Sequence, residues 1–177
     1  MKTEYEVRIL EVDVPEIVKK IEEMGAKRIE EHEFQRYTYD FNPPRDMEWI
    51  RLRTNGKKTT VTIKRVDSHT ADGTKELETE VGDFNAMNEI LERLGYDHKS
   101  YQENTRVSYM LDGVMLEIDS WPLIPTYLEI EGESEEAVYK MVEILGYERE
   151  KICTLDVSTI YKTIYNIDLD NIKELRA

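Results

Sequence analysis

Apolar residues recur every three or four positions in four stretches of the chain, the spacing expected of helices that pack by one face. The first three stretches end in a glycine, at Gly25, Gly95 and Gly146, where helices commonly terminate. Asp156 begins the fourth stretch, and Asp170 is placed to cap one further short turn. The pattern therefore predicts helices over residues 15–24, 83–94, 134–145 and 156–165.

Between these stretches apolar and polar residues alternate, which predicts strands with one apolar and one polar face. Asn55-Gly56 and Asp112-Gly113 are strong turn signals, so they predict hairpins that join 49–53 to 60–64 and 107–109 to 115–119. We expect loops at 42–44 and 121–125, because proline cannot donate a hydrogen bond to a central strand ladder.

A strand, a helix and a returning strand recur at an offset of 51 residues. Glu78-Thr79-Glu80 precedes a helix that ends in Leu94-Gly95-Tyr96, and Glu129-Ile130-Glu131 precedes one that ends in Leu145-Gly146-Tyr147. The segment 4–26 is a looser third copy. Repeated units of this kind favour one pseudo-symmetric domain over residues 1–177.

The charged residues of the predicted strands fall on one face of each strand. The carboxylates recur two positions apart, at Glu4 and Glu6, Glu78 and Glu80, Glu117 and Asp119, and Glu129 and Glu131. The basic residues that follow the same alternation are Arg8, Arg51, Arg53, Lys64 and Arg106. A solvated sheet face explains alternation alone, but carboxylates at this density repel one another unless a cation lies among them. If the sheet curls or closes, these side chains line a polar pocket.

Such a lining suits a polyphosphate bound together with its metal ions. Mg²⁺ and Mn²⁺ prefer carboxylate oxygen, while Arg and Lys hold phosphate oxygens. Phosphoryl transfer depends mainly on positioning and charge neutralisation, so it requires no Ser or His nucleophile.

Composition narrows the classes of function. The chain carries 24 Lys+Arg against 38 Asp+Glu, a formal charge of −14, which disfavours binding to nucleic acid or to an anionic membrane. Cys153 is the only cysteine, and the charged N-terminus does not resemble a secretory signal, so we expect a cytoplasmic protein without disulfides. His32, His69 and His98 lack a paired-ligand spacing, which argues against a zinc site.

The ordered set of charged residues resembles the CYTH superfamily, the triphosphate tunnel metalloenzymes. Glu4-x-Glu6-x-Arg8 resembles the opening ExExK signature of that family. The later matching positions are Arg51-x-Arg53, Lys64, Glu78-x-Glu80, Arg106, Asp119 and Glu129-x-Glu131. The segment 119–132 looks like the branch called class IV adenylate cyclase. The resemblance extends over nearly the whole chain.

The resemblance implies an α+β fold in which a closed or nearly closed eight-stranded antiparallel barrel forms a tunnel with helices outside. By similarity, Mg²⁺ or Mn²⁺ is expected at Glu4, Glu6, Asp119, Glu129 and Glu131. Glu78, Glu80 and Glu117 would support this acidic lining. The triphosphate would be bound by Arg8, Arg51, Arg53, Lys64 and Arg106, of which Arg8 and Lys64 are the candidate catalytic residues.

Two positions depart from the family pattern. Arg8 replaces the signature lysine, and Asn104 stands where the family usually has a lysine two residues before Arg106. Both changes are expected to affect the reaction rate and the strength of phosphate binding.

Three functions remain open on the sequence. Members of the family hydrolyse tripolyphosphate, thiamine triphosphate or nucleoside triphosphates, and others cyclise ATP to cyclic AMP and pyrophosphate. Hydrolysis is the simpler expectation, because it requires no adenine pocket and none is identifiable. A non-catalytic polyphosphate or nucleotide sensor is a third hypothesis, motivated by Arg8 and Asn104. A homodimer is compatible with the sequence, which leaves the metal, the organic group and the oligomeric state undetermined.

Overall fold

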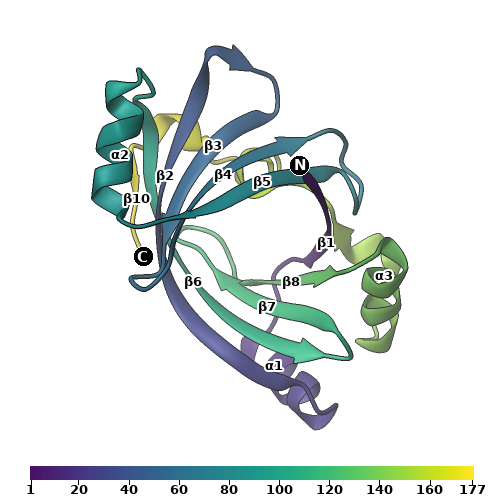
Figure 1. Cartoon of the computed structure of the whole chain (residues 1–177). Helices are drawn as coiled ribbons and strands as arrows, with labels where there is room; N and C mark the ends of the chain where they lie inside the picture. The colour runs from purple at the N-terminus through teal and green to yellow at the C-terminus, as the bar shows by residue number, and fades with distance from the viewer.

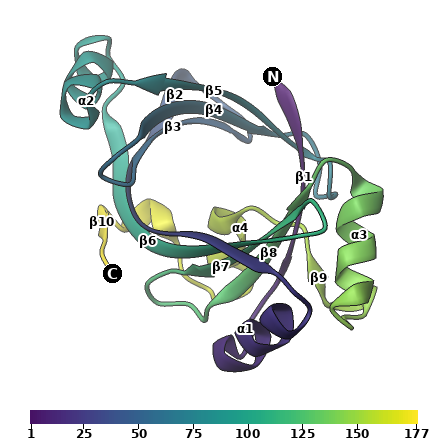
Figure 2. The same cartoon turned by 60° about the horizontal axis from the view of Figure 1, so that its bottom comes forward.

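The computed structural model of the chain describes residues 1–177 and shows a closed antiparallel β-barrel with helices on its outer side (Figure 1, Figure 2). Neighbouring strands follow the order β6-β2-β3-β4-β5-β1-β8-β7, and β7 pairs with β6 to close the ring. The barrel strands are β1 (Lys2–Ile9), β2 (Lys27–Arg45), β3 (Glu48–Thr54), β4 (Thr59–Val66), β5 (Thr74–Val81), β6 (His98–Leu111), β7 (Val114–Ser120) and β8 (Tyr127–Gly132). Two short strands extend the sheet, β9 (Ile152–Cys153) along β1 and β10 (Glu174–Leu175) along β6. The predicted fold class is confirmed.

Four helices match the four predicted stretches to within two residues at each end. Three lie against the outer wall of the barrel, and the fourth lies across one end, where its residues border the interior (Figure 2). In chain order the helices are α1 (Val14–Glu23), α2 (Phe84–Arg93), α3 (Glu135–Ile144) and α4 (Val157–Thr163). The predicted cap of the last short turn is wrong by two residues. The carboxylate of Asp168 accepts a hydrogen bond from the backbone N–H of Asp170, so Asp168 is the cap. None of the helices is long and apolar enough to span a membrane.

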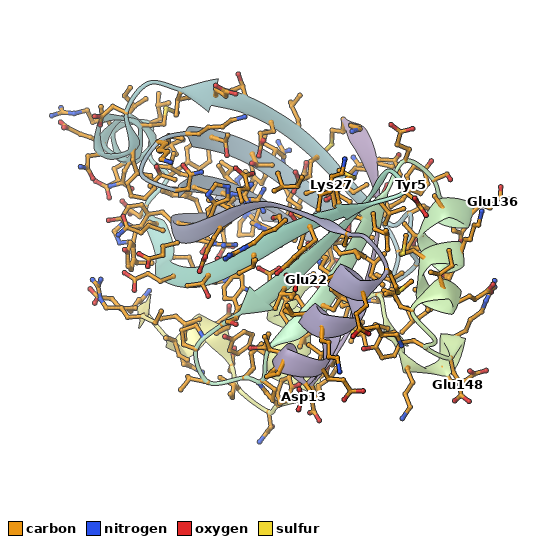
Figure 3. All side chains as sticks on the ribbon, turned by 90° about the horizontal axis from the view of Figure 1, so that it is seen from below. Tyr5, Asp13, Glu22, Lys27, Glu136 and Glu148 are labelled. Atoms are coloured by element: carbon orange, nitrogen blue, oxygen red, sulfur yellow. The ribbon has the colours of Figure 1, made fainter.

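The main hydrophobic core lies between the barrel wall and the helices rather than inside the barrel. Val7, Leu116 and Leu128 point outward from β1, β7 and β8 and pack with Ile21 of α1 and Val142 of α3. Asp13 and Glu22 mark the two ends of α1 on the outer side in Figure 3. A second cluster lies between α2 and the outer faces of β2 and β3. Because the apolar face of these strands packs against the helices outside the barrel, their polar face lines the interior.

The structure corrects the prediction for the two consecutive prolines. Strand β2 continues through Pro43 and Pro44 to Arg45, where a loop was expected. The pairing of β2 with β3 shifts register between Asp40 and Arg45, so the prolines lie in an irregularity where no ladder hydrogen bond is needed. Residues 121–126 form the expected connection between β7 and β8, and the hairpins at Asn55-Gly56 and Asp112-Gly113 are present.

The internal repeat corresponds to three strand-helix-strand units in the fold. These units are β1-α1-β2, β5-α2-β6 and β8-α3-β9. Their first strands are neighbours in the barrel, in the order β5-β1-β8. The Glu-x-Glu motifs of β1 and β8 therefore lie side by side on the inner wall, whereas Glu78 and Glu80 lie beyond the part of β5 that pairs with β1.

Helix α2 begins at an N-cap that can be tested directly. The carboxylate of Asp83 accepts a hydrogen bond from the backbone N–H of Ala86 at 2.7 Å. Removing this acceptor in Asp83→Ala is expected to lower the free energy of unfolding by about 1 kcal/mol, because an orphan amide loses its partner. Urea denaturation followed by circular dichroism checks this value, with Asp97→Ala, an exposed aspartate beyond the end of α2, as the control. Equal stability of both variants would contradict the assignment of Asp83 as a stabilising cap.

Candidate functional site

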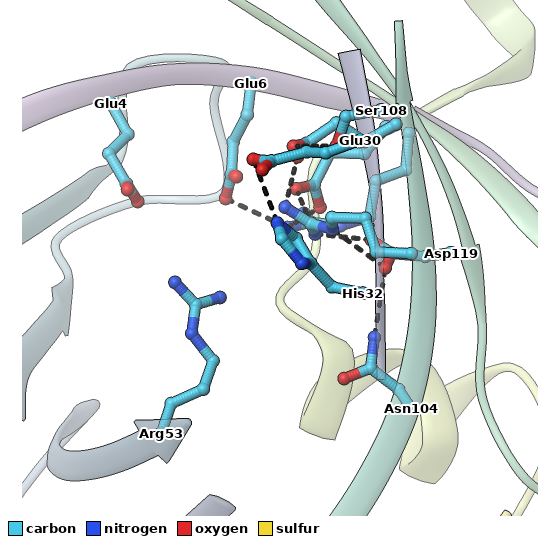
Figure 4. A network of polar contacts seen from close by, with 12 residues as sticks. Glu4, Glu6, Glu30, His32, Arg53, Asn104, Ser108 and Asp119 are labelled. Carbon is cyan, nitrogen blue, oxygen red and sulfur yellow. Dashed lines mark hydrogen bonds and ion pairs between the residues drawn. The ribbon is translucent and has the colours of Figure 1, made fainter. Parts of the chain in front are cut away.

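The predicted site residues come together inside the barrel with one exception. Figure 4 shows Glu4 and Glu6 of β1 and Asp119 of β7 pointing into the interior, with Arg53 reaching toward them from the opposite wall. The interior also receives Arg8, Arg51, Lys64, Glu78, Arg106, Glu117, Glu129 and Glu131. Glu80 lies at the rim, where its exposed carboxylate pairs with the Lys58 ammonium at 2.5 Å, so it is not part of the acidic lining.

One half of the inner wall, formed by β1, β7 and β8, is acidic. Its six carboxylates are those of Glu4, Glu6, Glu117, Asp119, Glu129 and Glu131. Only two guanidiniums lie among them. Arg8 contacts Glu6 at 2.9 Å and Glu129 at 2.7 Å, and Arg106 contacts Glu129 at 2.9 Å as well as Glu117 and Asp119. This half of the wall therefore carries surplus negative charge.

Burial and the neighbouring charges shift the pKa values of the acidic groups in different directions. Burial raises the pKa of Glu117 to about 7, against the pull of Arg106 and with help from the charge of Glu129. Burial and the charges of Glu129 and Glu6 also raise the pKa of Glu131, which forms no ion pair. Glu129 behaves differently, because Arg8 and Arg106 outweigh its burial and hold its pKa well below the usual range.

The other half of the wall, formed by β2 and β3, is basic. Arg51 lies 3.2 Å from Glu76 and 3.5 Å from Glu78, whereas Arg53 approaches only Glu78, at 4.0 Å. Burial and the neighbouring Arg51 lower the pKa of Arg53 to about 10. The positive charges of this half are thus incompletely balanced by protein carboxylates.

Lys64 of β4 lies between the two halves. Its ammonium is 3.0 Å from Glu4 and from Glu76 and 3.9 Å from Glu6. Despite this contact, burial raises the pKa of Glu4 to about 8, with Glu6 and Glu76 adding to the effect. Lys64 is therefore placed to bridge an anion on the basic side and the carboxylates on the acidic side.

Sequence reasoning missed two interior residues and one partly exposed pair. Glu76, rather than Glu80, forms the ion pairs with Arg51 and Lys64. Arg36 of β2 is buried in the basic half, and the alternation of Phe34, Arg36 and Thr38 against Tyr37 and Tyr39 was the signal that could have found it. His32 is half-buried and lies 2.9 Å from the exposed Glu30, and this pair lies near the network in Figure 4.

A cavity of ≈ 490 Å³ occupies one end of the barrel interior, and its lining includes Arg8, Arg36, Arg51, Lys64 and Trp121. Four buried N–H donors on these residues have no hydrogen-bond acceptor: the Nε atoms of the three arginines and Nε1 of the tryptophan. Two hollows of similar size lie outside the barrel and do not contain the charged network. Unpaired donors around a cavity are the complement of a ligand rich in acceptor oxygens.

The acidic half fits a divalent metal by the chemistry of its donors. All of its candidate ligands are carboxylates, the type that Mg²⁺ and Mn²⁺ prefer, and a cation would offset their surplus charge. No group of three or more acidic, His or Cys side chains is arranged around one point. The guanidiniums of Arg8 and Arg106 lie between the carboxylates and hold them apart. Metal binding would therefore require these ion pairs to rearrange.

A polar barrel interior with opposed acidic and basic walls defines a known class of protein. The model of the CYTH domain matches residues 2–163, so the chain belongs to the CYTH domain family. No protein of curated function matches it at a significant level.

Several solved structures share the fold. The PH1012 protein from Pyrococcus horikoshii is 26% identical with a TM-score of 0.74, over 86% of this chain and 96% of that one. A conserved hypothetical protein from Pyrococcus furiosus is 22% identical with a TM-score of 0.76, over 88% and 98%. A putative adenylyl cyclase from Hippeastrum is 16% identical with a TM-score of 0.62, over 94% and 97%.

Proposed function

We propose that the protein is a divalent-metal-dependent enzyme that hydrolyses a triphosphate inside the barrel. The observation that carries this proposal is the division of one enclosed interior into a wall with surplus carboxylates and a wall with surplus arginines. A polyphosphate accompanied by divalent cations neutralises both walls at once, because its oxygens face the arginines and its cations face the carboxylates. Neither partner alone would do so.

The residues of the chain have distinct parts in this proposal. Arg51 and Arg53 bind phosphate oxygens through guanidinium forks, and Lys64 adds a point charge next to the acidic wall. Glu4, Glu6, Asp119, Glu129 and Glu131 hold Mg²⁺ or Mn²⁺, which would supply neutralisation of the phosphate charge. Arg8 and Arg106 keep the buried carboxylates paired and in place before the ligand binds.

Hydrolysis needs fewer additional groups than cyclisation. Hydrolysis requires water and correctly positioned phosphates, and the interior charges are suited to position the phosphates. Cyclisation also requires the ribose and the base to be oriented. The structurally similar Hippeastrum protein is a putative adenylyl cyclase described as having a dominant triphosphatase activity. Hydrolysis is accordingly our first assignment, and cyclisation of ATP is the alternative.

The test is a substrate screen with purified protein. Tripolyphosphate, ATP and thiamine triphosphate are each incubated with Mg²⁺ or Mn²⁺ and with a chelator, and the products are separated by chromatography. Metal-dependent release of orthophosphate without cyclic AMP supports the proposal. Cyclic AMP with pyrophosphate would identify a cyclase, and tight binding without turnover under either metal would identify a sensor.

Lys64→Ala is expected to lower kcat/KM for the preferred triphosphate by about 10²-fold, because a buried cation near the developing charge is lost. Steady-state kinetics measures this effect. Lys58→Ala, which removes an exposed lysine from the neighbouring turn, serves as the control and should leave the rate unchanged. A Lys64 variant as active as the wild type would remove this residue from the site.

A further inference from the structure

Arg36 is an interior arginine whose contacts differ from those of its neighbours. It projects from β2, is only 7% exposed, and lines the cavity at one end of the barrel interior. Its guanidinium lies 4.4 Å from the ring of Trp121 and 5.9 Å from that of Phe34, and its Nη2 donates to the Oδ1 of Asn104. No carboxylate forms an ion pair with it, and its Nε has no acceptor.

The charges around Arg36 make its burial unfavourable without a ligand. Arg51, Arg53 and Arg106 are all close enough to repel it, and Asp119 is the main attractive charge. Burial, reinforced by Arg53 and Arg51, holds the pKa of Arg36 well below its usual range. An isolated buried charge is costly, so a residue kept only for stability would be neutral or paired with a carboxylate.

The surroundings hold the guanidinium in place without neutralising it. Trp121 supplies a flat apolar surface on which the guanidinium packs, an arrangement that fixes its plane. Asn104 accepts one hydrogen bond from Arg36 and donates another to Asp119 at 3.0 Å, so the amide joins Arg36 to the acidic wall. The remaining donors of Arg36 stay available toward the cavity.

We propose that Arg36 is a substrate-binding residue that holds the phosphate oxygens of the triphosphate at the Trp121 end of the cavity. This inference rests on the proposed function and adds a residue to it. Asn104 is uncharged, and Arg36 brings a positive charge to the same place from the adjacent strand, where Phe34 pairs with Asn104 across β2 and β6. The basic wall then consists of Arg36, Arg51 and Arg53, and the bound anion relieves their mutual repulsion.

The experiment compares the full-length wild type with Arg36→Gln and Arg36→Lys. Calorimetry measures the binding of sodium tripolyphosphate with and without Mg²⁺, product analysis measures turnover, and thermal denaturation measures stability. Arg28→Gln, at the exposed start of the same strand, is the matched control. The Gln variant should bind tripolyphosphate about 10- to 100-fold more weakly and denature at an equal or higher temperature, because an unpaired buried charge has been removed. The Lys variant should recover part of the affinity.

Each outcome decides the question. Unchanged affinity in Arg36→Gln, with an active wild type, would overturn the role of Arg36 and leave the proposed function standing. If the wild type binds tripolyphosphate without turnover and Arg36→Gln binds it more weakly, the role of Arg36 is supported and hydrolysis is overturned. Failure of the wild type to bind tripolyphosphate or either organic triphosphate of the substrate screen would overturn both. A large drop in melting temperature in Arg36→Gln, without recovery of binding in Arg36→Lys, would mark Arg36 as structural and overturn the inference.

Discussion

Replacing Glu129 with glutamine is expected to reduce metal-dependent triphosphate hydrolysis on the order of 10³-fold, the largest effect on activity in the molecule. Glu129 is 4% exposed and lies between the guanidiniums of Arg8 and Arg106, at the centre of the acidic wall. Glutamine keeps the shape of the side chain but removes the charge, so the wall attracts a divalent cation less strongly. The fold should survive, because Arg8 retains Glu6 and Arg106 retains Asp119.

Titration of Mn²⁺ by calorimetry distinguishes loss of metal from loss of another step. Glu129→Gln should weaken Mn²⁺ binding in parallel with activity, whereas Glu133→Gln, an exposed residue just beyond β8, should change neither. A Glu129→Gln enzyme that keeps wild-type affinity for Mn²⁺ and wild-type turnover would show that the acidic wall does not hold the metal.

Arg8→Ala is expected to lower the free energy of unfolding by about 3–5 kcal/mol, the largest loss of stability among the charged residues. The Arg8 guanidinium is 4% exposed and contacts Glu6 and Glu129, and its Nη1 donates to the carbonyl of Leu155 at 2.9 Å. Removing it leaves two buried carboxylates without this partner and frees the segment that leads into α4. Urea denaturation in the presence of a chelator measures the loss.

The same variant separates a structural role of Arg8 from binding of phosphate. Because a divalent cation can take the place of the lost positive charge, Mn²⁺ should raise the melting temperature of Arg8→Ala more than that of the wild type. Arg8→Lys should be intermediate, since an ammonium retains the charge but cannot reach both carboxylates and the carbonyl together. Equal stability of Arg8→Ala and the wild type in chelator would refute the view of Arg8 as a brace between the acidic wall and α4.

The helices and hairpins were largely predictable because their signals are local. Asp83 and Ser134 are N-caps, and each accepts a hydrogen bond from a backbone N–H three residues further on. Asn55-Gly56 forms a hairpin turn, which depends on the backbone angles of these residues. Strand β2 was predicted less well, because the prolines at 43 and 44 are tolerated by a register shift against β3. That shift depends on the partner strand and has no local signature.

The sequence predicted which residues line the candidate site better than it predicted the ion pairs that they form. The alternation at Glu4, Glu6 and Arg8 establishes that these side chains share a face, whichever way the sheet curves. It does not show that Arg8 braces Glu6 and Glu129, or that Glu80 turns to Lys58 at the rim. Such pairings depend on the register between strands and on where each strand reaches the end of the barrel.

The amino-acid sequence by itself determined that alternating strands would carry acidic and basic residues on one face and apolar residues on the other, because side-chain direction follows from the backbone period. Only the tertiary structure decided that this charged face closes on itself and that its carboxylates and arginines form opposite halves of one interior. It also decided that Arg36 lies there without a carboxylate partner. The physical reason is that charge balance in a buried space is set by distances between strands remote in sequence, which no local pattern encodes.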